Sequence, residues 1–188
     1  MLPTVREATE HQLTDLAGAN RHILGVVESQ QNLEELRLNP AALALLGEIE
    51  ATLQGHDVRL RTVAALKDRD FESGIKRALS ALSGAVVGSY NHLRRQAVSR
   101  ALRDTYAGLA FMSAGYVNLK TYGLTLGDLE ISKMAYDHFV DLTKLLVRLS
   151  QEMVVQTHRE IVATRNTPFQ QEIVDRVIAA TQRAWRDA

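Results

Sequence analysis

Long apolar stripes at helical spacing, with almost no proline to interrupt them, are the feature that most constrains this chain. The only three prolines stand at positions 3, 40 and 168, each where proline would fit the first position of a helix. No segment alternates apolar and polar residues with the period of two that marks a half-buried strand. The sequence therefore predicts an all-α protein.

Capping signals place the ends of the predicted helices. Asn39 is predicted to be the N-cap of a helix that begins at Pro40, and Thr167 and Pro168 are predicted to open the last helix. The pair Gly127-Asp128 is predicted to end a long helix and to allow a tight antiparallel return. Together these signals predict helices over about 5–32, 40–67, 71–92, 95–126, 129–165 and 168–186.

The chain length fits one domain. A chain of 188 residues with 46% hydrophobic residues can bury one good core and is short for two ordinary domains. Glycines weaken the helix predicted over 71–92, so this stretch is expected to be a short or broken helix that crosses between two halves of a bundle, with its connectivity left open. We therefore expect a single helical domain over 1–188, with a core bundle of about 5–165 and an extra C-terminal helix of about 168–186.

The helical stripes predict which residues point inward. Apolar residues recur every three or four positions in four long segments, and several polar residues interrupt them. Four long stripes and one crossover are expected to form a four-helix bundle with one long connection. The inward residues are predicted to be Leu13, Leu16, Asn20, Ile23 and Val27; Leu45, Ile49, Thr52, His56 and Val63; Leu102, Tyr106, Leu109, Met112 or Ser113, Tyr116 and Leu119; and Ile131, Ala135, His138, Leu142, Leu145 and Leu149.

Composition and missing motifs exclude several classes of function. The chain has no cysteine, which excludes thiolate chemistry and favours a reducing compartment, and no apolar stretch is long enough to span a membrane. We expect a cytoplasmic protein. The 22 basic and 22 acidic residues cancel, which argues against nucleic acid as a partner, and neither a nucleophile elbow nor a phosphate-binding glycine loop is present. Four arginines form a local cluster: Arg94, Arg95, Arg100 and Arg103. Such a cluster is typical of a solvated helix face, but a module that binds another helix or nucleic acid through these arginines remains a rival hypothesis.

Three segments carry a family resemblance. The stretches LTDLAGANRHIL, LQGHDVRLRTV and YVNLKTYGLTLGD resemble, in order and spacing, helices of the YciF-type (DUF892) branch of the ferritin-like superfamily. The resemblance covers roughly residues 10–155. It implies a ferritin-like four-helix bundle with a crossover, a stress-associated bacterial role, and a homodimer.

The resemblance also implies where metal-binding relatives hold their carboxylates. Those positions fall on Asn20, Thr52, Leu109 and Met112, and near the last position only Asp141 is acidic, or Asp137 if the register shifts. One carboxylate cannot neutralise two divalent ions, so these are degenerate metal positions and no resident cofactor is expected. A metal-free, non-enzymatic bundle follows as the leading hypothesis.

The histidines leave an alternative open. His56, His138 and Asp141 could bind one metal ion, iron or manganese, as a facial triad in an oxidoreductase or a metal-storage bundle. The plainer interpretation is that the histidines are locally hydrogen-bonded at the edge of the core, and that Asn20, Thr52 and His56 hydrogen-bond one another.

Two further patterns have structural interpretations. Tyr106, Tyr116 and Tyr122 could suggest an electron path, but tyrosines on a buried or interfacial face are the commoner case. The C-terminal helix has an apolar face that remains after four helices have filled the bundle. We expect this face either to cap its own bundle across the end or to pack on a second copy in a homodimer; its residues are Phe169, Ile173, Val177, Ile178 and Trp185.

Overall fold

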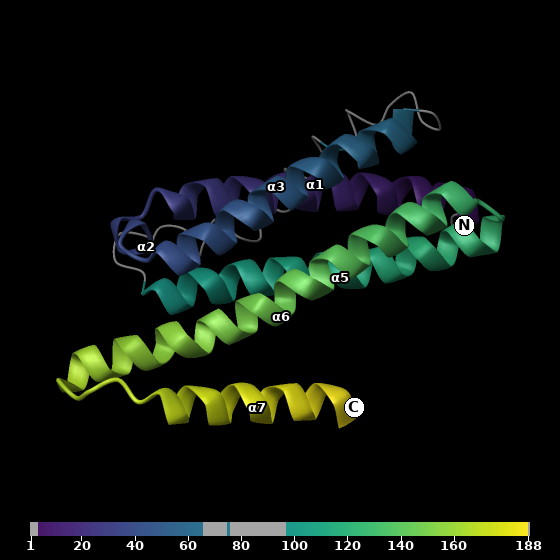
Figure 1. The fold of residues 1–188 in the computed structure, drawn as a ribbon. Helices are drawn as coiled ribbons and strands as arrows, with labels where there is room; N and C mark the ends of the chain where they lie inside the picture. Colours follow the sequence, from purple (N-terminus) through teal and green to yellow (C-terminus); the bar gives the residue numbers. More distant parts are fainter. Residues whose placement is uncertain (1–3, 66–74, 76–96, 188) are drawn as a thin grey trace.

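The computed structural model describes residues 4–65, 75 and 97–187, and the regular structure within these ranges is entirely α-helical (Figure 1). The all-α prediction is therefore confirmed for this part of the chain. None of the described helices is long and apolar enough to cross a membrane. The helices are α1 (Val5–Gln31), α2 (Glu34–Arg37), α3 (Pro40–Ala65), α5 (Val98–Leu126), α6 (Leu129–Arg165) and α7 (Gln171–Asp187).

Helix α1 runs antiparallel to both α3 and α5. The side chain of Gln12 donates to the carbonyl oxygen of Gly115 at 3.4 Å, and Gln30 donates to that of Ala101 at 3.0 Å. Residue numbers along α1 therefore increase while those of the contacted residues on α5 decrease, as in an antiparallel pair. Since α1 and α3 form a hairpin, α3 and α5 run in the same direction, and α5 begins at the end of the bundle opposite to the end of α3 (Figure 1).

Helix α6 closes the bundle against α3 and α5. Across the antiparallel α3–α6 pair, Arg59 lies 2.9 Å from Asp137, and Arg148 forms an ion pair with Glu48. The helices α1, α3, α5 and α6 thus form two antiparallel hairpins that share one core. The helix predicted over 71–92, except for buried Ile75, lies outside the described residues.

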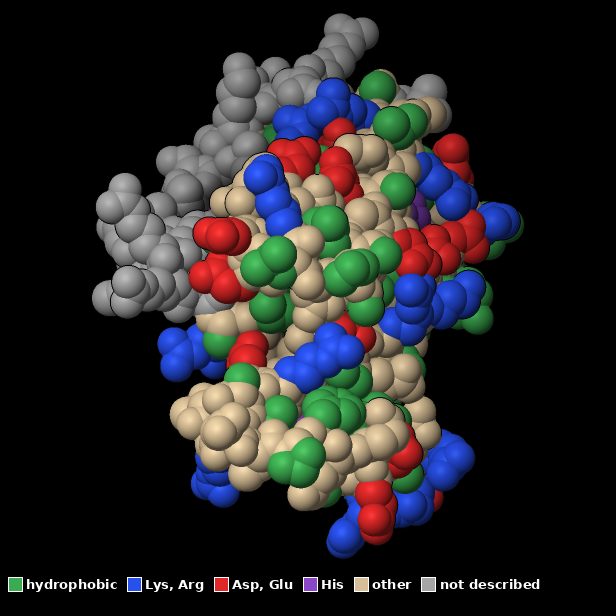
Figure 2. Space-filling view, turned by 60° about the vertical axis from the view of Figure 1, so that its left-hand side comes forward, with side chains coloured by type: hydrophobic (Ala, Val, Ile, Leu, Met, Phe, Trp, Pro, Cys, Tyr) green, Lys and Arg blue, Asp and Glu red, His purple; other side chains and the backbone are tan. Residues whose placement is uncertain are grey.

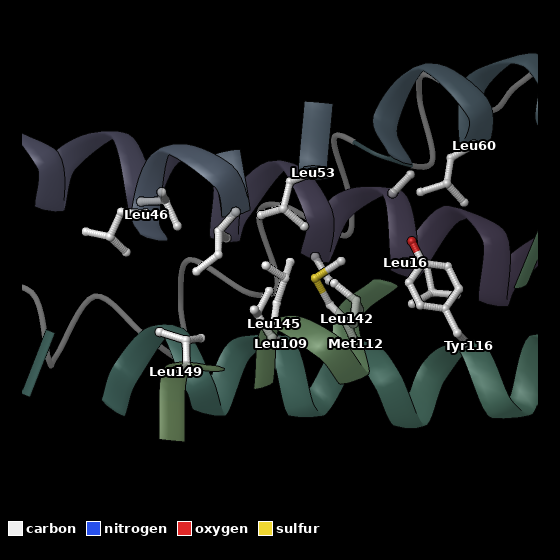
Figure 3. Packing of buried hydrophobic residues seen from close by; sticks show 14 of the residues in the cluster. Leu16, Leu46, Leu53, Leu60, Leu109, Met112, Tyr116, Leu142, Leu145 and Leu149 are labelled. Atoms are coloured by element: carbon white, nitrogen blue, oxygen red, sulfur yellow. The ribbon is translucent and has the colours of Figure 1, made fainter. Parts of the chain in front are cut away.

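The core contains most of the residues that the stripes predict. Figure 3 shows leucines from α1, α3, α5 and α6 pointing into a common space. Three predicted inward residues, Ile23, Thr52 and Tyr106, are only partly buried. On α3, Leu53 takes the inward position that Thr52 was predicted to hold, because the three-to-four spacing after Ile49 allows either residue and the apolar one is fully buried.

Most predicted helix ends are confirmed. The Asn39 side chain accepts from the amide of Ala42 at 3.2 Å, as an N-cap does. Gly127 adopts a left-handed conformation with φ of 68°, and the Asp128 side chain then accepts from the amide of Ile131 at 3.1 Å. Only glycine adopts such a φ without strain, so this pair makes the tight return between α5 and α6.

The predicted start of the last helix is wrong by three residues. Helix α7 begins at Gln171, because the amide of Gln170 donates instead to the His158 ring at 3.0 Å, and the Phe169 ring packs on the same imidazole. Pro168 therefore lies in a loop and does not open the helix. The one-turn helix α2 was not predicted either.

Helix α7 folds back along α6 on the side away from α1 and α3 (Figure 1). Among its residues only Val174 is buried. Ile173, Val177 and Trp185 remain 42%, 43% and 44% exposed, so much of the apolar surface of this helix is accessible to solvent. The C-terminal helix thus lies along the side of α6 and not across the end of the bundle, so the predicted end cap is wrong, and the homodimer alternative stays a prediction.

Candidate functional site

The centre of the bundle is the first candidate site, because three of the four positions at which the resemblance implies metal ligands lie there. Asn20, Leu109 and Met112 are each fully buried. Figure 3 shows Leu109 and Met112 of α5 beside leucines of α6, with Leu53 of α3 on the opposite side. The space in which metal-binding relatives are expected to hold carboxylates is thus filled by apolar side chains.

Asn20 is the polar exception in this layer. Its side-chain amide donates to the carbonyl oxygen of Leu53 at 2.9 Å, while its Oδ1 has no partner among the described residues. Thr52 instead donates to the carbonyl oxygen of Glu48 on its own helix at 2.9 Å, on the exposed side. The predicted hydrogen bonding among Asn20, Thr52 and His56 is therefore wrong, because Thr52 is rotated out of the core.

One turn further along the bundle, two histidines and a tyrosine form an aromatic cluster. The rings of His56 and His138 stack with centroids 3.7 Å apart and planes 12° apart. The Tyr116 ring meets both edge-on, at 5.0 Å from His138 and 6.0 Å from His56. Helices α3, α5 and α6 each supply one ring, and the three together are named here the His–Tyr cluster.

Two aspartates border the His–Tyr cluster at the surface. Asp141 lies 3.4 Å from Nε2 of His56, and its side chain is 47% exposed. Asp137 forms ion pairs with Arg59 at 2.9 Å and Lys133 at 2.8 Å. Hydrogen bonds from Lys133 and Arg59 hold the pKa of Asp137 below its usual value. Asp137 thus belongs to ion pairs at the surface, and Asp141 lies at the surface beside the buried His56.

Burial keeps the His–Tyr cluster uncharged. Loss of solvent, with smaller contributions from the neighbouring His56 and Arg59, lowers the pKa of His138 to about 2. Burial also lowers the pKa of His56, although the nearby Asp141 opposes this shift. The pKa of Tyr116 is raised by burial in the same way. Both imidazoles and the phenol are neutral at pH 7.

The geometry of the histidines does not fit a metal centre. A ligating imidazole presents its lone pair in the plane of the ring. Because the planes of His56 and His138 are nearly parallel and stacked face to face, their lone pairs do not converge on one ion. In the described parts of the chain, no three His, Asp or Glu side chains are grouped so that they could hold a metal ion.

The sequence named three residues that lie together in the structure but did not name all their neighbours. His56, His138 and Asp141 do lie together, as the alternative hypothesis required. Tyr116 and Arg59 were missed as neighbours of the histidines. Tyr116 follows Met112 on the inward face of α5, and Arg59 follows His56 by three residues, so both spacings offered a signal.

An apolar groove between α6 and α7 is the second candidate site. Its volume is about 440 Å³, and its walls include Met153, Ile161, Ile173, Val177 and Trp185. In Figure 2 hydrophobic side chains reach the surface at the lower part of the molecule, the height at which Figure 1 places α7 and the C-terminal part of α6. Its described lining includes no acidic residue, lysine or arginine, and most of its surface is apolar; the polar lining residues are Tyr106, Ser150, Thr157, His158 and Thr181.

The described residues do not show the predicted arginine cluster as a binding site. Arg103 pairs with the neighbouring Asp104 at 2.9 Å, and Arg94 and Arg95 lie outside the described residues. Figure 2 shows acidic and basic side chains interspersed on the visible face. Comparison of the chain with protein-family models, with curated proteins and with solved structures finds no match.

Proposed function

We propose that this chain is a ferritin-like helical bundle that has lost its dimetal centre and acts as a non-enzymatic structural protein. The observation that carries the proposal is the apolar filling of the bundle centre. Leu109 and Met112 are fully buried at positions where the resemblance implies metal ligands. Two divalent ions at this place would lack the hard oxygen ligands that offset their charge.

The order of the helices supports the ferritin-like part of the proposal. A ferritin-like bundle joins two antiparallel hairpins by one long crossover, so that its second and third bundle helices run in the same direction. Helices α3 and α5 run in the same direction, and the chain between them covers residues 66–97. A simple up-down bundle with short loops would make these two helices antiparallel.

The energetics of burial support the metal-free part. A cluster of carboxylates without metal would be costly inside the bundle, because an unpaired buried charge loses its hydration. In this chain the two aspartates beside the His–Tyr cluster, Asp137 and Asp141, instead lie at the surface and pair with basic groups. Apolar residues at the implied ligand positions and acids at the surface are both consistent with a core that holds no ions. The YciF-type resemblance adds a stress-associated bacterial role to the proposal.

A metal-binding oxidoreductase or metal-storage bundle, using iron or manganese, is the second candidate. One observation favours it: His56, His138 and Asp141 come from two helices and lie together. Binding would require the stacked imidazoles to turn until their lone pairs converge, at the cost of their present packing. Among these three residues, the negative charge that offsets the metal ion would then come from one carboxylate, that of Asp141.

Thermal unfolding with and without metal ions tests the proposal. A ligand that binds only the folded state raises the unfolding temperature, and the rise is larger for a tighter ligand. We expect Fe²⁺, Mn²⁺ and Zn²⁺, each in excess over the protein, to leave the unfolding temperature unchanged. A rise of several degrees in the native chain that disappears in Asp141→Asn, but persists in a variant of the exposed His11, His11→Gln, would contradict the proposal and favour the second candidate.

A further inference from the structure

The groove between α6 and α7 is formed by two helices that do not close on each other. They meet at the loop before α7, where the His158 ring contacts Phe169 and accepts from the amide of Gln170, and Figure 1 shows them diverging from that loop. Val174 of α7 is buried, whereas Val177, one turn further and also in the groove lining, stays 43% exposed. Apolar side chains therefore surround a space that the helix pair does not fill itself.

The size of this groove fits a small molecule. Its volume of about 440 Å³ lies within the roughly 300–1,000 Å³ of pockets that bind small ligands. Tyr106 of α5 also lines it, so residues from three helices surround the space. The groove is open on one side, so a molecule of this size can enter without separating the helices.

The charge of the lining favours an uncharged molecule. Within the parts of the chain that the structure describes, neither an acidic residue nor a lysine or arginine lines the groove. An ionised group that moves into such a place loses hydration, and no opposite charge there replaces it. A carboxylate or an ammonium group is therefore disfavoured, while an apolar chain or ring gains the free energy of burial.

The polar residues of the lining favour an acceptor oxygen on that molecule. Since Nε2 of His158 accepts from the amide of Gln170, the proton of the neutral ring is on Nδ1, which can donate. The hydroxyls of Tyr106 and Thr157 have no hydrogen-bond partner among the described residues and can donate as well. The groove thus offers donors without an accompanying positive charge, which matches the oxygen of a ketone or an ester.

We propose that the groove between α6 and α7 binds an uncharged, mainly apolar small molecule with one acceptor oxygen, such as a medium-chain ketone or ester. The site lies outside the bundle centre and adds a ligand to the structural role proposed above. The chain has a single tryptophan, Trp185, which lines this groove. Its fluorescence therefore reports binding at the proposed site directly.

Titration of the full chain with 2-decanone, followed by the emission of Trp185, tests the proposal. We expect a saturable change with 2-decanone. Decanoate has the same number of carbon atoms but carries a charge, and we expect it to bind at least several-fold more weakly. Decanoate binding as tightly as 2-decanone, or no saturable change with 2-decanone, overturns the proposal.

A variant that fills the groove tests where the molecule binds. Val177→Phe enlarges a lining residue and is expected to weaken 2-decanone binding at least several-fold. Val117→Phe is the matched control, because Val117 on α5 is 48% exposed and does not line the groove; it is expected to bind as the native chain does. Unchanged binding in Val177→Phe, or equal loss in both variants, overturns the assignment to this groove.

Sedimentation velocity of the native chain distinguishes a small molecule from a second copy. We expect the sedimentation coefficient to be the same with and without 2-decanone. A chain that dimerises alone, and binds 2-decanone only as the dimer dissociates, would assign the groove to a second copy and overturn the proposal. Metal content is a separate measurement, so failure of this proposal leaves the proposed metal-free bundle untouched.

Discussion

Protonation of the buried histidines should make the bundle less stable in mild acid. His138 has a folded-state pKa of about 2, against about 6.5 for an exposed histidine. Below pH 6.5 the unfolded chain therefore binds a proton that the folded chain does not. Each pH unit then costs about 1.4 kcal/mol, so lowering the pH from 6.5 to 5.0 removes about 2 kcal/mol of unfolding free energy through His138. His56, whose pKa is also lowered, adds to the loss.

Urea unfolding at pH 7.5 and pH 5.0, followed by circular dichroism, measures this loss. In His138→Leu the difference between the two pH values should shrink by about 2 kcal/mol, since leucine cannot bind the proton. The exposed His11 provides the control, and His11→Gln should keep the native difference. If His138→Leu and the native chain lose the same free energy, the neutral buried His–Tyr cluster is refuted.

Two further pairs of variants test the packing. Gly123→Ala would bring its Cβ to 2.8 Å from the backbone nitrogen of Ser132, so we expect it to lower the unfolding free energy by about 1–3 kcal/mol. In Gly55→Ala the Cβ meets nothing within 4 Å, and better helix propensity should raise stability by roughly 0.5–1 kcal/mol in the same urea assay. Asn20→Ala loses a buried hydrogen bond and should cost about 1–3 kcal/mol, whereas Thr52→Ala should cost less than about 0.5 kcal/mol by calorimetry. Equal changes in unfolding free energy within either pair would contradict the packing described for its residues.

Helix positions were predictable because their signals are local. The Gly127-Asp128 return depends on one left-handed residue and one capping side chain, both visible in the sequence. The same holds for Asn39 before α3. The start of α7 was missed, because the contact that delays it comes from His158, twelve residues before Gln170. Contacts between segments leave no such local signal.

The candidate site was only partly predictable for the same reason. Helical spacing correctly placed Leu109, Met112 and His138 in the core. It could not choose between Thr52 and Leu53, since both fit a three-to-four spacing and only the packing of neighbouring helices decides the rotation of α3. Nor could spacing show that the two imidazoles stack, because the relative orientation of side chains on different helices depends on tertiary packing.

Close approach between helices also depends on glycines whose role cannot be recognised from the sequence. A Cβ at Gly115 would lie 2.7 Å from Cδ2 of Leu16, and one at Gly108 would lie 2.3 Å from Cδ1 of Ile23. These glycines let α1 lie close against α5. In the sequence they resemble ordinary weak points of a helix, and only the packed structure shows that the missing side chains make room.

Elemental analysis of the purified full-length chain tests the metal-free bundle most directly. The protein would be soaked in ferrous, manganous and zinc salts, desalted, and measured by inductively coupled plasma mass spectrometry. We predict well below one metal ion per chain, with the same residual amount in His56→Ala. One or more ions per chain, lost in His56→Ala or Asp141→Ala while the fold is retained, would contradict the proposal that this bundle has no metal centre.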